Sequence, residues 1–304
     1  TRSPSPAPFR ADLPRTTRGE QPDRLTIWTE CLVTKVSLSD EEPLHALGVE
    51  YLAGKHLYHA HPVALRNDAP GTPAQVFAAR EVILCGGAFN TPQLLMLSGI
   101  GPREHLAEVG VTCRQDLSGV GSNLHDRYEV TVVSEMENDF ILLDQIDFGL
   151  PADGAPPDPA LKRWRTNGTG LYSSNGSVLG ILKRSREELA QPDLFIFGLP
   201  LSFKGYETGY SQKPKHNFFT WAILKAHTQN RDGTVRLRSS DPRATPEINF
   251  HYFHETSWET DTREDDPDLL ALLAGVKFVN GIAKHAASVV KQRFSPSETD
   301  VPSI

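Results

Sequence analysis

Two glycines that follow an apolar run give this chain one segment suited to binding an anion. Residues 82–85 read Val-Ile-Leu-Cys and precede Gly86 and Gly87. The apolar run predicts a buried strand, and glycine permits close approach of the backbone to a ligand. A helix that begins after such a turn points free N–H groups at a negative charge such as a phosphate. The same pattern also fits an ordinary strand-to-helix connection with no ligand.

The residues after the glycines predict a short helix with defined ends. Asn90 or Thr91 can cap its N-terminus, and Pro92 fits the first helical position, where a missing N–H costs nothing. Gly99 predicts the end of the helix after about two turns. The predicted order is therefore strand, glycine turn and helix, with the anion-binding end of the helix at the turn.

Four segments resemble, in order, the motifs of the glucose-methanol-choline (GMC) family of flavin oxidoreductases. Residues 87–101 resemble the second signature of the family, and residues 101–110 resemble the short helix that follows it. Residues 116–126 are similar to the family's Val-Gly-x-Asn-Leu-x-Asp segment, and residues 240–249 resemble the turn that opens a later block. Because several motifs agree in the same order, the chain is identified as a member of this family.

The resemblance implies FAD as the cofactor and oxidation of an alcohol, in a choline dehydrogenase-like manner, as the reaction. In the family a hydride passes from the alcohol carbon to the flavin, and a histidine near the C-terminus takes the hydroxyl proton. Two parts of the family pattern have no match. The Gly119-Val-Gly121 pair is followed by Leu124 where a Gly-x-Gly-x-x-Gly loop needs glycine, and the chain stops at Ile304, before the histidine segment. We therefore expect a central portion of a GMC protein, inactive alone.

The resemblance carries four cofactor-binding residues over to this chain: Val33, Gly87, Ala88 and Asn123. The family contacts the adenine through a valine backbone at the position of Val33, and it approaches the flavin nucleotide at the positions of Gly87 and Ala88. Asn123 matches the asparagine of the Asn-Leu-x-Asp motif. The alternatives that involve no ligand are a plain strand valine at position 33 and simple turn geometry at positions 87 and 88.

No catalytic or metal-binding residue is predicted. Arg127 stands where the family usually has a histidine, and its cation would pair with Asp126 or with an anionic ligand. His285, on the last predicted helix, reads as a helix-end charge and not as the catalytic base. Three other histidines share a polar loop with no cysteine or carboxylate at ligand spacing, which favours a surface loop over a metal site; they are His56, His59 and His61.

The composition argues against several classes of partner. The chain has 304 residues and a formal net charge of -7, which argues against binding to nucleic acid or to acidic membranes. No apolar run approaches the roughly 20 residues that span a bilayer. The three cysteines are widely spaced, and Cys85 reads as a small buried hydrophobe. We expect a cytoplasmic protein whose partner is a small-molecule alcohol, with no nucleic acid and no membrane.

The remaining pattern predicts an α/β fold in two parts. Residues 1–124 would form a partial FAD-binding, Rossmann-like domain in which the Pro-rich residues 1–23 are extended or disordered. Residues 125–304 would form part of an α+β substrate-binding domain with an antiparallel sheet, followed by a helix that Asp266 caps. The strands expected from β-forming residues are 25–37, 46–52, 75–79, 194–197, 218–224 and 234–238.

We interpret the chain as part of an FAD-dependent oxidoreductase that acts on the CH–OH group of an alcohol. The alternative, from a different class, is a non-catalytic remnant or interaction module of the GMC fold that binds no flavin. The sequence names neither the alcohol nor the acceptor that reoxidises the flavin, because no motif marks the residues of the substrate pocket.

Overall fold

The computed structural model describes residues 25–64, 70–146, 148, 151, 154–206, 216–253 and 266–295, so the expectation for residues 1–23 lies outside the described residues. The chain divides into two compact units. Unit 1 comprises Thr1–His125 and Arg231–His251, and unit 2 comprises Asp126–Asn230 and Tyr252–Ile304. The first change of unit falls beside the boundary expected at residue 124. Residues 231–251, expected in the second domain, group with unit 1.

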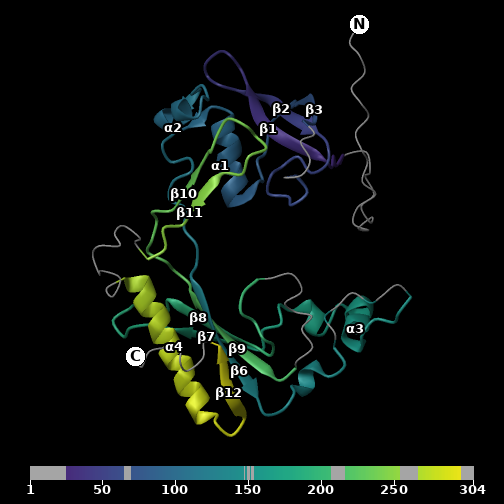
Figure 1. Ribbon diagram of the computed structural model, residues 1–304, viewed down its shortest axis with the longest axis vertical. Helices are drawn as coiled ribbons and strands as arrows, with labels where there is room; N and C mark the ends of the chain where they lie inside the picture. Colours follow the sequence, from purple (N-terminus) through teal and green to yellow (C-terminus); the bar gives the residue numbers. More distant parts are fainter. Residues whose placement is uncertain are drawn as a thin grey trace. The chain divides into compact units, whose positions relative to one another are not determined.

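Unit 1 contains a three-stranded antiparallel sheet in the order β1 (Cys31–Leu38), β2 (Ala46–Ala53) and β3 (Thr72–Phe77). The three strands predicted here are confirmed, with bounds that shift by a few residues. Helix α1 (Gly87–Leu97) packs on β1 (Figure 1). The buried N–H of Val36 donates to Ser98 Oγ at 2.8 Å, which ties β1 to the end of this helix.

Shorter elements complete unit 1. They are β4 (Ile100–Gly101), α2 (Arg103–Glu108), β5 (Gln115–Asp116), β10 (Thr234–Arg236) and β11 (Glu247–Asn249). Strand β4 pairs with β5 in parallel, and β10 pairs with β11 in antiparallel. Met96, Leu106 and Leu237 form a buried apolar cluster that joins α1 and α2 to the residues after β10. This cluster fixes the first of the two chain segments of unit 1 to the second.

The strand predicted at residues 82–85 is wrong. The segment has no regular secondary structure, Ile83 is 73% exposed, and Cys85 is exposed where we predicted a buried hydrophobe. A strand needs a neighbour to pair with, and no described residue pairs with this segment. Its apolar side chains alone therefore do not bury it.

Helix α1 begins earlier than predicted. Gly86 is its N-cap, so Asn90, Thr91 and Pro92 lie inside the helix and do not start it. Pro92 is tolerated there, although it removes the N–H that would have bonded to the carbonyl of residue 88. The predicted end is confirmed, because the helix stops at Leu97 and Gly99 has a φ of +83°.

Unit 2 is built on a five-stranded antiparallel sheet in the order β12-β6-β9-β8-β7. Its strands are β6 (Glu129–Met136), β7 (Leu179–Lys183), β8 (Leu194–Leu199), β9 (Phe218–Lys225) and β12 (Val290–Ser295). The predicted antiparallel sheet is confirmed at β8 and β9, whereas β6, β7 and β12 were not predicted. The strand predicted at residues 234–238 pairs instead within unit 1, as β10.

Helix α4 (Pro267–His285) covers one face of this sheet (Figure 1). Asp266 caps it as predicted, since its carboxylate accepts from the N–H groups of Asp268 and Leu269. Alternate residues of the strands, such as Ile196 and Ile223, pack with Leu272 and Val279 of the helix. The other helical elements of unit 2 are η3 (Ile141–Leu143), α3 (Pro159–Asn167) and η4 (Leu171–Ser173). In the described part of the chain, no helix has the length and apolar character needed to cross a membrane.

Candidate functional site

The N-terminus of α1 presents backbone donors in an open position. Gly87 has a φ of +78°, a conformation that favours glycine, and an added Cβ there would meet no atom within 4 Å. The first N–H groups of a helix have no partner inside the helix, and no acidic side chain lies in the first turn. Gly87 and Ala88 therefore lie where a phosphate oxygen can accept hydrogen bonds from the backbone.

The side chain of Asn90 forms hydrogen bonds that hold this turn in place. Its Nδ2 donates to Tyr58 Oη at 2.7 Å and to Gln93 Oε1 at 2.8 Å. Gln93 is 4% exposed and donates in turn to the carbonyl oxygen of Ala244 at 2.7 Å. Hydrogen bonds thus tie the first turns of α1 to one loop before the helix and to one segment far along the sequence.

An apolar cavity of about 630 Å³ adjoins the start of α1. Val33 of β1 and Gly86 both line it, so the structure brings one predicted residue and the N-cap of α1 to the same cavity. The polar side chains of Tyr58, Asn90 and Gln93 also reach its wall, and Glu81 is the single charged residue among the described residues that line it. Apolar walls with a few polar groups are typical of sites for planar organic rings.

Asn123 lies in a separate exposed turn of unit 1, with a φ of +58°. The turn is fixed on both sides, because Leu124 N donates to Gly233 O and Val235 N donates to Gly121 O, each at 2.8 Å. At Gly121 an added Cβ would lie 2.2 Å from the carbonyl oxygen of Val235, so only glycine fits this close approach. No contact places Asn123 beside Val33 or Gly87.

The Asp126–Arg127 pair does not form the ion pair that we considered. Arg127 reaches Asp126 through its backbone N–H, at 2.8 Å from Oδ1, and in the described part of the chain its guanidinium forms no ion pair. The second oxygen of Asp126 accepts from Tyr252 Oη at 3.3 Å. Burial, followed by the charge of Asp126, raises the pKa of Tyr252 to about 12, so this tyrosine stays protonated and donates a hydrogen bond to Asp126 throughout the neutral range.

A row of side chains that the sequence did not indicate lies on the face of the unit 2 sheet opposite α4. Strand register makes Glu129 the partner of Leu224, Leu224 the partner of Phe195, and Phe195 the partner of Leu182. Phe195 is 36% and Leu182 72% exposed, and the Phe195 ring stacks on Phe197 with centroids 5.3 Å apart. Glu129 is exposed as a residue, yet desolvation of its carboxyl group raises its pKa. One carboxylate therefore shares an open face with an aromatic pair.

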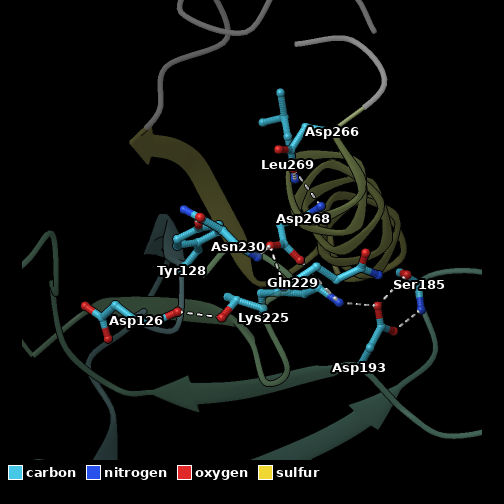
Figure 2. A network of polar contacts seen from close by, with 11 residues as sticks. Asp126, Tyr128, Ser185, Asp193, Lys225, Gln229, Asn230, Asp266, Asp268 and Leu269 are labelled. Carbon is cyan, nitrogen blue, oxygen red and sulfur yellow. Dashed lines mark hydrogen bonds and ion pairs between the residues drawn. The ribbon is translucent and has the colours of Figure 1, made fainter. Parts of the chain in front are cut away.

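A buried polar network on the α4 side of the same sheet joins β8, β9 and the start of α4 (Figure 2). Lys225 Nζ lies 2.9 Å from Asp193 Oδ2 and 3.8 Å from Asp268 Oδ1, and all three side chains are at most 11% exposed. Asp193 also accepts two hydrogen bonds of 2.7 Å from Ser185.

The network continues from Asp268 to Tyr128 (Figure 2). Asp268 Oδ2 accepts from the N–H groups of Gln229 and Asn230, and Asn230 Nδ2 donates to Tyr128 Oη at 2.9 Å. The carbonyl of Tyr128 accepts from Lys225 N at 2.8 Å. These contacts pair most of the buried polar groups with one another, which is typical of a structural network. Asp268 Oδ1 accepts no hydrogen bond from the described part of the chain and is compensated only by the charge of Lys225.

The described histidines do not gather with other side chains that bind metals. No group of three or more metal-ligating side chains occurs among the residues that the structure describes. The rings of His56 and His61 lie 4.1 Å apart in the predicted loop, and exposed His285 contacts Gly281 O at 2.8 Å through Nδ1. His105 is 6% exposed, and its Nε2 accepts from Leu237 N at 3.0 Å, so it supports the core of unit 1.

Sequence reasoning missed Glu129 and Lys225. Apolar and polar residues alternate only weakly over β6, which hid the strand that carries Glu129. A charged residue at the end of the apolar strand β9 was the available signal for Lys225, because a buried lysine requires a carboxylate partner. The identity of that partner follows only from the fold.

Comparison with known proteins finds similarity to GMC oxidoreductases over part of the chain. The family model described as GMC oxidoreductase matches residues 19–129. The oxygen-dependent choline dehydrogenase of Chromohalobacter salexigens is 35% identical over 199 residues, which are 65% of this chain and 34% of that protein. The enzyme of the same name from Escherichia coli O17:K52:H18 is 32% identical over 239 residues, which are 77% of this chain and 38% of that protein.

Solved structures agree with this placement at the level of the fold. A formate oxidase variant from Aspergillus oryzae RIB40, studied for FAD modification, matches with a TM-score of 0.65 and 23% identity over 88% of this chain and 46% of that chain. The chain belongs to the GMC oxidoreductase family. It spans about a third of the length of the choline dehydrogenases that it resembles, at 34% and 38% in the two cases above.

Proposed function

We propose that the chain forms part of an FAD-dependent oxidoreductase that acts on the CH–OH group of an alcohol. The observation that carries this proposal is the open N-terminus of α1 beside the apolar cavity, on the segment that the family match covers. In this reading unit 1 is part of a Rossmann-like FAD-binding domain, and unit 2 is part of the substrate-binding domain. The alcohol is a small molecule, and neither nucleic acid nor a membrane is a partner.

The residues of unit 1 fit the nucleotide part of FAD. An added Cβ at Gly87 would occupy open space, so this glycine keeps the helix end accessible to a phosphate. The backbone of Val33 lines an apolar cavity suited to an adenine ring, and Ala88 adds an N–H in the first helical turn. Asn123 would contribute from its own turn. When bound, FAD would supply the acceptor for the hydride of the alcohol carbon, which carries two electrons.

The substrate that the open face of unit 2 fits best is an alcohol with a cationic substituent. Glu129 and Phe195 lie two strand spacings apart in one row, about 10 Å. A carboxylate and an aromatic face at that separation attract an organic ammonium group from two sides. Support comes from the relatives, which are named choline dehydrogenases. Glu129 would bind and orient such an alcohol, and no described residue is assigned to take its proton.

The rival proposal is a non-catalytic interaction module of the GMC fold. The observation that favours it is the amount of exposed apolar surface on unit 1, where Ile83 is 73% and Phe77 71% exposed. Surfaces of this kind mark protein interaction sites. The two proposals differ in one measurable property, since the interaction module would bind no flavin.

FAD titration of the purified chain tests the proposed function. We expect weak binding that does not survive gel filtration but changes the amide NMR signals of Gly87 and Ala88. Gly87→Val should weaken binding about tenfold, because its side chain occupies the open space beside the helix end and valine disfavours the φ of +78°, which together disturb a charge-assisted contact of the backbone. Gly110→Val is the matched control, because Gly110 has a similar φ of +74° and equally open space around its Cβ. Equal losses in both variants, or no binding at millimolar FAD, would contradict the proposal.

A second titration tests the substrate class. Choline should bind more weakly to Glu129→Gln by about fivefold, in line with the loss of one exposed charge contact. The neutral analogue 3,3-dimethylbutanol has the same shape and no charge, so it should bind both forms equally. Equal binding of choline to both forms would contradict the proposed role of Glu129 in substrate binding.

A further inference from the structure

Strand β7 (Leu179–Lys183) forms one edge of the unit 2 sheet and leaves one side of its backbone open. It pairs with β8 alone, and no described strand pairs with its outer side. The carbonyl of Lys183 accepts from Asp193 N at 3.2 Å, on the β8 side. Because successive residues of a strand direct their backbone groups to opposite sides, the N–H and C=O groups of Gly180 and Leu182 point outward. These outward groups are a template for a further strand.

The other edge strands of the two larger sheets carry features that oppose such pairing. Strand β12 shows two register shifts against β6 and carries Lys291 and Arg293. Strand β1 shows two register shifts against β2, and β3 contains Pro73. Strand β7 shows no register shift, contains no proline and has one charge, that of Lys183 at its end. Natural proteins protect open edges with charges, prolines and bulges, so β7 is the edge suited to pairing among these strands.

The side chains of β7 combine an exposed leucine with a glycine on one face of the sheet. Leu182 is 72% exposed, and Gly180, two residues before it, presents no side chain on the same face. An added Cβ at Gly180 would lie 3.1 Å from Cε2 of Phe195, so the Phe195 ring borders the space that the glycine leaves. An apolar side chain of a further strand, placed opposite Gly180, would contact this ring. Opposite Leu182, a residue without a side chain would let the leucine reach across.

We propose that β7 is the interface of a homodimer, in which the β7 strands of two copies of this chain pair in antiparallel with Ile181 of one copy opposite Ile181 of the other. A strand reversed about Ile181 brings Leu182 of each copy opposite Gly180 of the other. The outward backbone groups of these two residues then form four hydrogen bonds, two at each pair. The same five residues thus supply both the leucine that fits beside the glycine and the glycine that accommodates the leucine.

This self-complementary pattern is what favours a second copy over a different partner, because a two-fold contact uses one patch twice. The charges agree with the register. Lys183 lies opposite Leu179 of the partner subunit, and the two Lys183 residues are four strand positions apart, about 14 Å along the strand. The pairing therefore brings no two like charges together.

The dimer goes beyond the proposed function, because its formation requires no flavin. It also leaves open the place proposed for the ammonium group of the substrate. In the strand order β6-β9-β8-β7, Glu129 lies on the side of Phe195 away from β7, whereas the partner subunit adds its strand beyond β7. The two proposals therefore use opposite sides of the Phe195 ring.

Sedimentation equilibrium of the purified chain without FAD tests the dimer. We expect a monomer–dimer equilibrium with a dissociation constant on the order of 10 µM, because a small interface gives weak affinity. Leu182→Lys should weaken it about tenfold or more, since the cation would lie against an apolar ring of the partner subunit without a carboxylate. Ile141→Lys is the matched control, because Ile141 is 92% exposed in the same unit but lies in η3 and not in the edge strand. Far-UV circular dichroism should be the same for both variants.

Disulfide trapping tests the register, in a chain that carries Cys85→Ser because Cys85 is exposed. Ile181→Cys should form a covalent dimer on mild oxidation, since directly opposite residues of a non-hydrogen-bonded pair have Cα atoms about 4.5 Å apart, within reach of a disulfide. Val178→Cys is the control, because Val178 is 44% exposed beside the same strand. Its two copies would lie six strand positions apart, about 20 Å, so no covalent dimer should form.

The outcomes separate the dimer from the flavin function. A chain that stays monomeric at about 100 µM would overturn the proposal, and so would a dimer that Leu182→Lys leaves intact. A dimer in which Ile181→Cys forms no disulfide would overturn the proposed register and with it the interface. A dimer that forms as expected from a chain that binds no FAD would uphold the interface and contradict the flavin function, whereas FAD binding by a chain that stays monomeric would do the reverse.

Discussion

The two units differ in how far their apolar and polar groups find partners within the described part of the chain. In unit 2 the helix α4 covers one sheet face, and the buried cation of Lys225 is paired with the carboxylates of Asp193 and Asp268. In unit 1 an apolar segment has no hydrogen-bond partner in the described part of the chain, and the cavity beside it is open to apolar ligands. The difference teaches that polar groups paired within the fold indicate a structural role. An unfilled apolar surface beside free backbone donors indicates a binding site.

This contrast also separates two groups of polar atoms, the network around Lys225 and the backbone N–H groups of the first turn of α1. The network around Lys225 is buried and its charges are paired with one another, so we assign it to stability. The first turn of α1 is open, and its N–H groups face no acidic side chain of that turn, so we propose it as a ligand site. The carboxyl of Glu129 shares a property with each group, because it lies on an open face and burial raises its pKa.

The largest expected effect is the loss of the buried cation of unit 2. Lys225→Met leaves the carboxylates of Asp193 and Asp268 buried without their partner, which should lower the free energy of unfolding of unit 2 by about 3–5 kcal/mol. Urea unfolding followed by tryptophan fluorescence measures this loss. Lys291→Met is the control, because the Lys291–Glu135 pair is half exposed on the lysine side and should contribute less than about 1 kcal/mol. Similar losses in the two variants would contradict a network whose buried charges are paired.

A smaller effect is expected from acid. Burial opposes the charge of Asp193, but hydrogen bonds from Ser185 and the ion pair with Lys225 outweigh it and lower the pKa of this carboxyl. Since the folded pKa lies below the unfolded value, the stabilisation is complete above about pH 4 and is lost as the pH falls through the folded pKa.

The acid effect is checked with two variants. Asp193→Asn should flatten the fall of unfolding free energy below about pH 4. Glu129→Gln should instead steepen the fall of unfolding free energy in acid. Because the pKa of Glu129 is raised in the folded state, protonation of this carboxyl stabilises the folded state as the pH falls, and the variant loses that gain. Acid profiles of both variants that match the unsubstituted chain would show that neither carboxyl is perturbed.

The smallest expected effect on folding lies in unit 1. Ile83→Lys should change the free energy of unfolding by no more than about 0.5 kcal/mol, because the side chain is 73% exposed and packs little within the chain. Thermal unfolding measures the change. A loss near that of Lys225→Met would show that residues 82–85 are packed, and the contrast between the units would fail.

The parts of the fold that were predicted depend on local chemistry. Asp266 and Pro267 begin α4 as expected, and Gly99 follows the end of α1, because caps and backbone angles act within a few residues. The prediction of a buried strand at residues 82–85 was wrong. Burial depends on neighbouring elements, which the sequence of the segment does not contain. Strand β12 was missed for a related reason, since it is a short edge strand defined by its pairing with β6.

The candidate site was predicted in part. Val33 and the glycine turn were named from motifs, and the structure brings Val33 and Gly86 to one cavity, although their role as cofactor ligands stays a prediction. Asn123 was named in the same way but lies in a separate turn. Glu129 and Phe195 were beyond sequence reasoning, because only the register of β6, β9 and β8 places them in one row.

Amide hydrogen exchange of the chain alone tests the central contrast most directly. The account predicts slow exchange in β6, β8 and β9, where paired strands lie under α4, and nearly unprotected exchange at residues 82–85. The first turn of α1 should also exchange fast, because its N–H groups have no intrahelical partner. Protection of residues 82–85 equal to that of β9 in the monomeric chain would contradict the account.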